Sequence, residues 1–550
     1  MKQFYLLLCL LFATASVSAQ TTHFVDADAA GANDGTSWAD AFSNLSDALA
    51  GAASGDIILV AEGTYTPPAD STFFVSTNLT IIGGFDGTST NPEDADPATN
   101  VVILSGDTAG DDVPGDTQTN RGDNVRIMFV DSLITDPTFI VGLNFVGGTT
   151  GITPEDEFID DYTGGGILSY SPIAVSLCNF TDNFADFGSG IGLLGGDASG
   201  SLIDQINASG NVTASNGAVY VNGADLVAVQ NSIFDGNTAD RSAVYGFASN
   251  GFTVDNCTFT NNTGLNRGSA VGFVFTYPGT LNNCVINNNP IGAVGGAIYV
   301  ASDADIPLND PLFGMYIDSC SVVGNASDGN FGGGLLSLDG NLFITNSEFR
   351  ANSTPGRGGA IWATNNSVVE GKILDARNSS FTENQGTVLG AAIYTQNPFN
   401  LTIDSSEVSQ NGNETASGRG AICMLQDFGN TGIKQDVVIT NTEFFNNVTT
   451  AEGAAIYIQN PTNGTTIDIS DASFIGNIGP SIGGAMFFRP GNTSTFNNVI
   501  GNLNQADDGG FIWALEEQNA DSLNIPVAKV TVHHCKAGFR NVEAVCILLF

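Results

Sequence analysis

Positive charge is scarce in this sequence. Only 15 lysines and arginines stand against 57 aspartates and glutamates over 550 residues, a formal net charge of −42 at pH 7. So acidic a surface repels nucleic acid and anionic lipid, and neither is expected as a direct partner. Hydrophobic residues make up 42% of the chain, too many for a disordered acidic protein. The composition therefore predicts a folded, strongly acidic protein with a sizeable core.

Long apolar runs are missing beyond the amino terminus. Residues 1–19 combine a basic Lys2, an apolar run and a small-x-small ending at Ala19, which is typical of a secretory signal peptide. No later run reaches the ~18 residues of a membrane-spanning helix. We therefore expect a secreted protein, extracellular or at the outer surface of a bacterium, without direct membrane insertion.

Helical periodicity is the third absence. From residue 161 onward no stretch keeps a 3.6-residue period for the length of a helix, which excludes a helical solenoid. Segments such as residues 252–259 and 401–408 instead alternate β-branched and aromatic residues with polar ones, and glycine or asparagine bounds them. They predict short β-strands.

What the sequence has in abundance is a repeat. Three small residues followed by an aliphatic one, as in Gly358-Gly359-Ala360-Ile361, recur at intervals of about 29 residues. In this first motif the aliphatic residue is Ile167, Ile191, Val219, Val244, Val271, Ile298, Leu335, Ile361, Ile393, Ile422, Ile456, Met486 and Ile512.

A second motif alternates with the first: an apolar residue followed three positions later by asparagine. The coil through Ile206 has Ser209 where the asparagine is expected. The matches are Phe180/Asn183, Phe234/Asn237, Phe259/Asn262, Ile286/Asn289, Val322/Asn325, Phe349/Asn352, Phe381/Asn384, Val408/Asn411, Phe444/Asn447, Phe474/Asn477 and Val499/Asn502.

Coils of this length with short strands predict an all-β, right-handed, single-stranded parallel β-helix, in which each strand pairs with its equivalent one coil away. Glycine in the first motif allows a positive φ and a close backbone approach, and the asparagines can adopt a left-handed conformation at their turn. We expect the asparagines to hydrogen-bond to one another from coil to coil.

The alternation of the two motifs resembles the repeat of polymorphic outer membrane proteins, and the architecture resembles the wider pectate-lyase-like superfamily. The resemblance covers about residues 162–541. It implies a secreted or surface-displayed β-helix, often with an adhesive role.

The chain divides into a signal peptide (1–19), an amino-terminal cap with the first irregular coils (20–160), the repeat β-helix (161–541) and a short tail (542–550). In the cap, Thr36 or Ser37 is expected to start a helix that presents Trp38, Phe42, Leu45 and Leu49 on one face, before a strand after Asp56. The tail is either a truncated end or a naturally short last coil.

Aromatic residues often follow the aliphatic residue of the first motif. If the aliphatic residue points inward, they form an outward row suited to stacking on sugar rings or on a partner surface. The alternative is that the aromatic side chains are buried. These candidates for binding carbohydrate or a partner are Tyr220, Tyr245, Tyr299, Trp362, Tyr394, Tyr457, Phe487 and Trp513. Insertions after the same strand, at residues 301–315, 365–372 and 425–436, are expected to wall a groove beside the row.

Two acidic loops offer oxygen ligands at spacings compatible with calcium. One contains Asp26, Asp28 and Asp34, with Asn33 between them; the other contains Asp107, Asp111, Asp112 and Asp116. Neither matches an EF-hand or a nonapeptide calcium repeat, and ordinary solvated acidic turns are the preferred interpretation. Calcium is the one cofactor that the sequence suggests.

Five cysteines share the position two residues before the apolar residue of the second motif, where other coils have serine or threonine. A small inward-facing residue suits this position. Cys257 and Cys284 are close enough for a disulfide, although unbridged stacking is the expected arrangement. The five are Cys178, Cys257, Cys284, Cys320 and Cys535.

These features favour an adhesin or a glycan-binding or structural surface protein, whose partner is a polysaccharide, a surface glycan or a receptor on a host or neighbouring cell. The alternative is a polysaccharide lyase or glycoside hydrolase acting on an acidic polysaccharide. The paired acids Asp111-Asp112, Asp160-Asp161 and Asp507-Asp508 would be its candidate carboxylates. Adjacent strand residues point to opposite faces, and no basic motif accompanies these pairs, so a non-enzymatic role is preferred.

Overall fold

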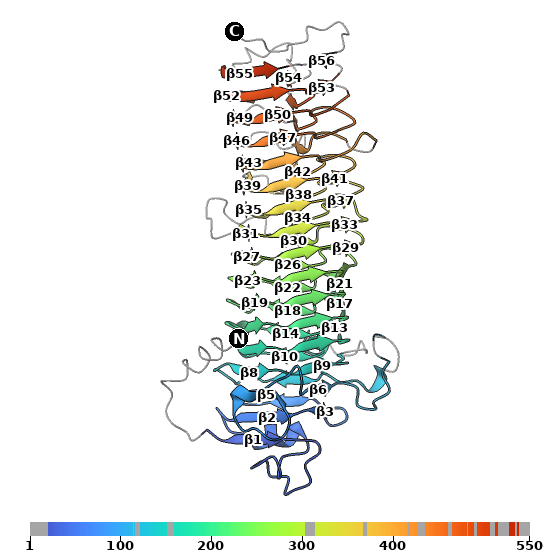
Figure 1. Ribbon diagram of the computed structural model, residues 1–550, viewed down its shortest axis with the longest axis vertical. Coiled ribbons are helices and arrows are strands. Elements are labelled where there is room, and N and C mark those ends of the chain that lie inside the picture. The colour runs from blue at the N-terminus through green and yellow to red at the C-terminus, as the bar shows by residue number, and fades with distance from the viewer. Residues whose placement is uncertain are drawn as a thin grey trace. The chain divides into compact units, whose positions relative to one another are not determined.

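The computed structural model describes residues 20–113, 115, 121–150, 159–302, 314–366, 371–415, 418–426, 435–459, 465–480, 482–488, 492–506, 512–514, 527–533 and 536–537. The described residues up to Asn237 form one compact unit, unit 1, and those from Thr238 form a second, unit 2. Within each unit the chain winds as a right-handed parallel β-helix, with equivalent strands of successive coils paired (Figure 1). The predicted fold class is confirmed. The predicted signal peptide and residues 538–550 lie outside the described part.

Each regular coil contributes strands to up to four rows. We call them the motif-one row, the middle row, the motif-two row and the outer row, in chain order. In unit 1 the motif-one row is β4 (Phe73–Val75), β7 (Met128–Val130), β10 (Ile167–Ser169), β14 (Ile191–Leu194) and β18 (Val219–Asn222). The middle row is β1 (Thr22–Val25), β2 (Ile57–Ala61), β5 (Thr80–Phe85), β8 (Thr138–Val141), β11 (Ile173–Ser176), β15 (Leu202–Asp204) and β19 (Ala228–Gln230). The motif-two row is β3 (Gly63–Tyr65), β6 (Val102–Ser105), β9 (Asn144–Val146), β12 (Asn179–Thr181), β16 (Asn207–Ser209) and β20 (Ile233–Asp235), and the outer row is β13 (Phe184–Phe187) and β17 (Val212–Asn216).

Unit 2 repeats the same rows. Its motif-one row is β22 (Val244–Phe247), β26 (Val271–Val274), β30 (Ile298–Ala301), β34 (Leu335–Leu338), β38 (Ile361–Thr364), β42 (Ile393–Gln396), β45 (Ile422–Leu425), β48 (Ile456–Gln459), β51 (Met486–Phe488) and β54 (Ile512–Ala514). Its middle row is β23 (Phe252–Asp255), β27 (Gly279–Asn282), β31 (Gly314–Asp318), β35 (Asn341–Thr345), β39 (Lys372–Arg377), β43 (Phe399–Asp404), β46 (Asp436–Thr440), β49 (Thr465–Ser470), β52 (Asn492–Asn502) and β55 (Val527–His533).

The motif-two row of unit 2 is β24 (Thr258–Thr260), β28 (Val285–Asn287), β32 (Ser321–Val323), β36 (Glu348–Arg350), β40 (Ser380–Thr382), β44 (Glu407–Ser409), β47 (Glu443–Phe445) and β50 (Ser473–Ile475), and β52 continues into it. The outer row is β21 (Thr238–Arg241), β25 (Thr263–Gly264), β29 (Pro290–Ile291), β33 (Ala326–Ser327), β37 (Ser353–Thr354) and β41 (Gln385–Gly386), and β53 (Gln505–Ala506) pairs with β56 (Lys536–Ala537).

The aliphatic residues of the first motif stack in register, as predicted. Ile298 pairs with Leu335, and Leu335 pairs with Ile361, each on the neighbouring strand of the motif-one row. All three side chains are fully buried. The core of each unit therefore consists of equivalent aliphatic side chains stacked in register, one layer per coil.

The predicted asparagine stacking is also confirmed. Asn352 is representative: its backbone N–H and its side-chain Nδ2 donate to Oδ1 of Asn384 in the next coil, at 3.0 and 3.2 Å, and Nδ2 also donates to the carbonyl of Val322 at 2.8 Å. We call these buried rows the asparagine ladders: Asn183, Asn211 and Asn237 in unit 1, and Asn262, Asn289, Asn325, Asn352, Asn384, Asn411, Asn447, Asn477 and Asn504 in unit 2.

The coil that contains β52 and β53 differs from the prediction by two residues. Asn504, rather than Asn502, accepts from Asn477. The residue paired with Phe474 is Gly501, so the apolar position of this coil is occupied by glycine, and Val499 fills the small-residue position two places earlier.

A similar offset restores the ladder in unit 1. Ala208 pairs with Phe180, so Ala208 occupies the apolar position of this coil. The ladder position is therefore Asn211, not Ser209 as predicted. The prediction aligned this coil on Ile206, which is the larger side chain but sits in the small-residue position.

The left-handed backbone lies one residue before the ladder asparagine rather than at it. Ala351 has a φ of 54° and Glu383 a φ of 59°. The turn therefore tolerates several residue types, while the buried position after it requires an amide.

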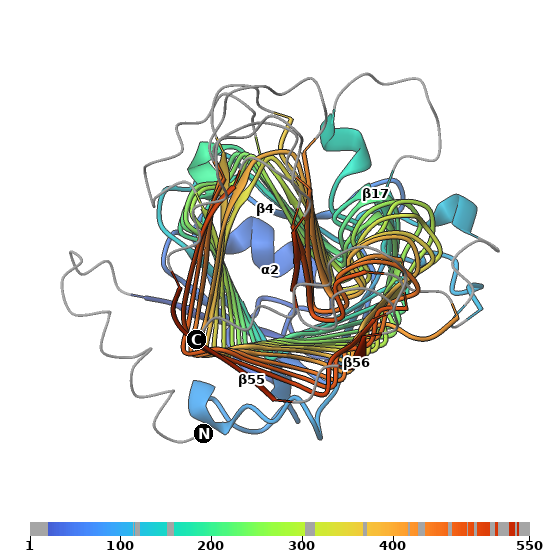
Figure 2. The same ribbon diagram turned by 90° about the horizontal axis from the view of Figure 1, so that it is seen from above.

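The cap begins as strand, helix and strand, but the helix is shorter than predicted. Helix α2 (Leu45–Gly51) is capped by Asn44, whose side chain accepts from the N–H of Ser46, and Leu45 and Leu49 are buried. Thr36 and Ser37 do not start a helix, because Asp34 and Asp40 hold residues 34–40 in turns, and Phe42 instead forms a parallel bridge with Val25. The described part of unit 1 also contains the short 3-10 helices η1 (Pro92–Asp94), η2 (Arg121–Asp123), η3 (Ile159–Tyr162) and η4 (Gly196–Ala198). In unit 1, α2 lies over the middle of the coil cross-section (Figure 2).

The outer row adds a second layer to the repeat coils. In unit 2 the segment between the ladder asparagine and the next motif-one strand curls outside the main coil (Figure 2). This curl carries the arginines that precede the first motif. It therefore covers the outward face of the motif-one row.

Among the described residues, no helix is long and apolar enough to span a membrane.

Candidate functional site

The row of aromatic residues in the motif-one strands exists, but it is not exposed. Trp362 pairs with Tyr394, Tyr457 with Phe487, and Phe487 with Trp513 in register. The expectation of a solvent-facing row is wrong because the side chains of Tyr220, Tyr245, Tyr299, Trp362, Tyr394, Tyr457 and Phe487 are all buried, at 6% exposure or less. The side chain of Trp513 lies outside the described part.

Arginines of the curl contribute to this burial in unit 2. Arg357 lies over the ring of Tyr394 at 5.3 Å, and Arg419 lies over that of Tyr457 at 5.0 Å. A guanidinium over an aromatic face is attracted by the ring quadrupole. Both sides of the motif-one strand are thus buried, with aliphatic residues inside the main coil and aromatic residues under the outer row.

The early coils of unit 1 lack this cover. Phe74 and Phe129 occupy the same register as the buried aromatics, and their rings stack at a centroid distance of 5.7 Å. Phe74 is 46% exposed, because the outer row begins only at β13. Neither residue belongs to a recognisable first motif, so the repeat did not identify them.

The first acidic loop does not form a cation site. Asp26 accepts from the N–H of Asp28, and Asp34 accepts from the N–H and hydroxyl of Thr36, so each carboxylate caps its own turn. The hydrogen bonds from Thr36 hold the pKa of Asp34 below its usual value. The three carboxylates of Asp26, Asp28 and Asp34 do not converge, which corrects this part of the calcium prediction.

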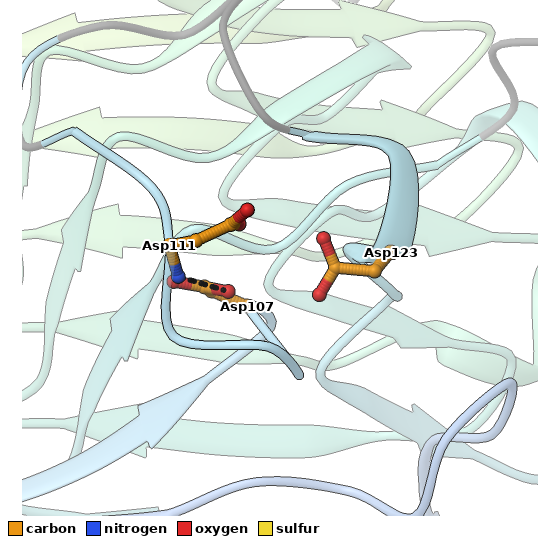
Figure 3. Close-up of side chains that lie close together, drawn as sticks. All are labelled: Asp107, Asp111 and Asp123. Atoms are coloured by element: carbon orange, nitrogen blue, oxygen red, sulfur yellow. Dashed lines mark hydrogen bonds between the residues drawn. The ribbon is translucent and has the colours of Figure 1, made fainter.

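The second acidic loop does bring carboxylates together. Asp107, Asp111 and Asp123 have oxygens within 4.8 Å of one another (Figure 3). Asp112 turns aside to accept from Asn124 and to face Arg121 at 3.9 Å, and burial raises its pKa. Asp107 accepts from three N–H groups of its own loop. Asp116 lies outside the described residues. Calcium at this loop stays a prediction.

A shallow groove in unit 2, which the sequence did not reveal, is one concavity of the described surface. It has a volume of about 730 Å³ and follows the bend between the middle and motif-two rows across six coils. We call it the corner groove. One side is Asn283, Ser319, Asn346, Asn378, Ser405 and Asn441; the floor is Cys284, Cys320, Ser347, Ser379 and Ser406; the other side is Val285, Ser321, Glu348, Ser380, Glu407 and Glu443.

Local backbone geometry builds the groove. The residues of the first side have φ values near 50°, for example Asn346 at 51° and Ser405 at 50°, so the chain bends at this position in every coil. The amide of Asn346 donates to Asp318 of the preceding coil at 2.8 Å, and that of Asn441 donates to Asp404 at 3.1 Å. These hydrogen bonds fix the orientation of the asparagine side chains on the first side of the groove.

The charged groups around the groove are predominantly acidic. Glu407 and Glu443 lie on adjacent paired strands, and Glu348 is bonded to Arg350 at 2.8 Å. No lysine, arginine or histidine is among the described residues that line the groove. The surface therefore offers acceptors and negative charge to a ligand.

The cysteine thiols of the groove floor and of the equivalent positions in other coils are unreactive. Hydrogen bonding to Cys257 and Cys320, together with burial, raises the pKa of the Cys284 thiol far above its usual value, and burial raises that of Cys178 to about 12. Within the described part, no disulfide links Cys257 to Cys284. Nucleophilic catalysis requires a thiolate, so these cysteines are structural. Cys535 lies outside the described residues.

The loops expected to wall an aromatic groove cannot be assigned. Residues 303–313, 367–370 and 427–434, which form most of the three insertions, lie outside the described part.

Comparison with known proteins finds distant structural neighbours but no family. No protein-family model and no curated protein matches the sequence. Among solved structures, the catalytic domain of a GH87 α-1,3-glucanase in complex with nigerose aligns over 94% of this chain and 69% of its own, with 11% identity and a TM-score of 0.32. A rhamnogalacturonan lyase aligns over 86% and 84%, with 11% identity and a TM-score of 0.23. PfbA, a surface adhesin of Streptococcus pneumoniae, aligns over 77% and 86%, with 11% identity and a TM-score of 0.26. These neighbours are pectate-lyase-like parallel β-helix proteins, and the likeness concerns the fold alone.

Proposed function

We propose that this chain is an exported or cell-surface protein that binds a polysaccharide along the corner groove. The observation that carries the proposal is the groove itself, whose polar side chains repeat with the rise of the coil, about 4.8 Å. A sugar unit of an extended chain has a similar length. A linear glycan lying along the groove would therefore meet equivalent hydrogen-bonding groups at successive coils.

The charge of the groove favours a neutral glycan. Glu407 and Glu443 lie on the groove surface, and the one nearby guanidinium bonded to a groove residue, that of Arg350, is already paired with Glu348. A polyuronate would meet carboxylates without a compensating cation, and like charges repel more strongly in a partly desolvated site. This argues against the acidic polysaccharides first considered for an enzyme.

Catalysis in the same groove is the weaker alternative. Glu407 and Glu443 are one coil apart, but they extend from the same row of strands rather than from opposite sides of a cleft. A hydrolase needs an acid and a second carboxylate on either side of the scissile bond. A lyase needs a base beside the abstracted proton, and the described lining supplies no basic side chain.

A blocking substitution tests the site. Ser380→Trp places a bulky ring within the groove, whereas Thr402→Trp places the same ring on the outward face of the neighbouring β43. We expect wild type and Thr402→Trp to bind at least one of laminarin, mannan or soluble α-1,3-glucan in affinity electrophoresis, and Ser380→Trp to bind it at least about tenfold more weakly, about 1.4 kcal/mol. Equal binding by both variants, or strongest binding to polygalacturonate, contradicts the proposal.

Assays for reducing ends and for ultraviolet-absorbing unsaturated sugars, run on the same polymers, distinguish binding from cleavage. Accumulating product would replace the binding role with the enzymatic one. A role as an adhesin of the polymorphic outer membrane protein type, with a receptor on a neighbouring or host cell, belongs to the same proposal and is supported by the alternating motifs.

A further inference from the structure

The cap of unit 1 contains a second concavity, separate from the corner groove. It has a volume of about 580 Å³, and its lining residues include the aromatic Phe24 and Trp38, the acidic Asp26, Gly87, and the hydroxyl-bearing Thr36, Ser37, Thr88 and Thr90. We call it the cap pocket. Volumes of this size are common for small-molecule sites, which combine apolar walls with a few polar groups.

The aromatic wall is rigid. Trp38 is half-buried, its Nε1 donates to the carbonyl of Ser89 at 2.9 Å, and its ring packs against Phe24 at 4.9 Å and Phe85 at 5.7 Å. Phe24 and Phe85 belong to an apolar cluster on the outer face of the middle row. The tryptophan ring is thus held in one orientation before any ligand arrives.

Hydrogen bonds also hold the Asp26 carboxylate in place. The N–H of Asp26 donates to Phe42, and the next N–H, of Ala27, donates to the hydroxyl of Tyr65, which in turn donates to Ala61. Oδ1 of Asp26 accepts from Asp28. Oδ2 lies near Gly87, which has a φ of 78° and where an added Cβ would stand 3.4 Å from that oxygen. Glycine therefore keeps the space beside Oδ2 open.

The polar groups of the pocket are mainly acceptors. The hydroxyls of Thr36 and Thr88 donate to Asp34 and Asp86, and that of Ser37 donates to Asp40. The threonine oxygens keep lone pairs for a ligand that donates, whereas the Ser37 oxygen already accepts from the N–H of Asp40 at 3.2 Å. No basic side chain lines the pocket among the described residues, so an anionic ligand would find no counter-charge.

We infer that the cap pocket binds a neutral sugar residue, with one face of the sugar against Trp38 and its hydroxyls donating to Asp26 and to the threonine and serine oxygens. A sugar combines an apolar face with several donors, which matches an aromatic wall beside a set of acceptors. This site is independent of the corner groove: it would hold a short saccharide or a chain end, not a chain along the coils.

The test titrates the full chain with glucose, maltose, cellobiose and laminaribiose by isothermal titration calorimetry. At least one of these sugars is expected to bind. Asp26→Asn keeps the acceptor for Asp28 but removes the charge, and should weaken binding about tenfold, since hydrogen bonds to an ionised acceptor are stronger than those to a neutral one. Asp28→Asn, in the same turn but outside the lining, is the matched control and should bind as wild type.

A second variant guards against loss of folding. Trp38→Phe keeps an apolar ring on the cluster but reduces the stacking face, so it should weaken binding while circular dichroism stays unchanged. Tryptophan fluorescence should change on sugar binding in wild type and lose that change in Trp38→Phe, because the two other tryptophans, Trp362 and Trp513, both belong to the other unit.

Three results would overturn the inference: no binding of any of the four sugars at about 50 mM, above the millimolar Kd range of weak sites; equal binding by Asp26→Asn; or binding of choline in place of sugar, which would make the pocket a cation site. The proposal for the corner groove is tested independently of this one. Ser380→Trp should leave disaccharide binding intact, and Asp26→Asn should leave polymer binding intact.

Discussion

At the scale of single residues, the ladder asparagines show why one side chain recurs in every coil. A buried turn leaves backbone groups without water, and each must find a partner. Asn352 accepts from the N–H and Nδ2 of Asn325 and donates to Asn384 and Val322. An amide offers both an acceptor and two donors on one short stem. Serine, aspartate or leucine cannot make all of these bonds.

Replacing one ladder residue should therefore be costly. Asn352→Ala leaves the amide of Asn325 and the carbonyl of Val322 without their bonds, and we expect the free energy of unfolding to fall by about 3 kcal/mol. Asn330→Ala, at an exposed position of the same coil region, is the control and should change little. Urea unfolding followed by circular dichroism measures both. A loss as small as that of the control would show that the ladder adds no stability.

Asp318, which accepts a hydrogen bond from the groove residue Asn346, should make the stability of the protein depend on pH. The hydroxyl of Thr345 donates to Asp318 at 2.5 Å, and this bond, with others from Asn346 and Ser319, lowers the pKa of Asp318. A lowered folded-state pKa stabilises the protein above the unfolded pKa, about 3.9 for aspartate, and the stabilisation is lost as pH falls through the folded value.

Asp318→Asn removes this dependence. At pH ~6 the variant should melt at a lower temperature than wild type, and the difference should shrink as pH falls below about 3.9. Differential scanning fluorimetry across this range measures it. A difference that stays constant with pH would mean that the charge of Asp318 contributes nothing.

At the scale of elements, the outer row decides what the motif-one strands expose. The strands alternate aliphatic and aromatic residues, and the aliphatic side alone left open whether the aromatic side is buried or faces solvent. The curl places Arg267, Arg357 and Arg419 over aromatic rings and buries both sides. The aromatics therefore support the layer rather than a ligand.

Tyr394 tests this structural role. Tyr394→Ala empties a fully buried position and should lower the free energy of unfolding by about 3–5 kcal/mol, whereas Tyr394→Phe keeps the ring and should cost about 1 kcal/mol. Chemical denaturation of both variants, with glycan binding of Tyr394→Phe, provides the measurement. A stable Tyr394→Ala variant that has lost glycan binding would reinstate the aromatic row as a binding surface.

At the scale of the whole molecule, charge is the dominant feature. A net charge of −42 destabilises the compact state through self-repulsion, and dissolved salt screens it. The ion pairs at Arg350 and Arg377 are exposed and offset little of it.

Raising NaCl from about 0.02 M to about 0.5 M should therefore raise the melting temperature by several degrees. Tetramethylammonium chloride at equal ionic strength is the control and should act similarly, because the effect does not depend on a bound cation. A melting temperature that falls with both salts would show that attractive pairs, rather than repulsion, govern stability.

Much of the fold could be predicted because a solenoid repeats one local rule. Once Ile361 marks the first motif of a coil and Phe381 marks the second, most of the remaining coils can be aligned on the same two positions. The alignment failed where size misled it: Ile206 and Val499 are large residues in a small-residue position, and Gly501 occupies an apolar one. Pairing of backbones tolerates such exchanges, because hydrogen bonds between strands do not depend on the side chain.

The candidate sites were predicted less well, for a physical reason. Exposure of Tyr394 depends on a segment that folds over it, and exposure of Phe74 depends on the absence of that segment. Neither can be read from the strand that carries the residue. The corner groove arises from left-handed bends stacked over several coils, and serines and asparagines in such bends look like ordinary turn residues.

By itself, the sequence determined the parallel coil, its period, the asparagine ladders and the excess of negative charge, since each depends on residue type and spacing along the chain. Only the tertiary structure decided which surfaces remain open. The groove between stacked bends and the pocket between Trp38 and Asp26 join segments that are distant in sequence or belong to different coils. Their side chains converge because of backbone pairing and covering layers, which no local pattern encodes.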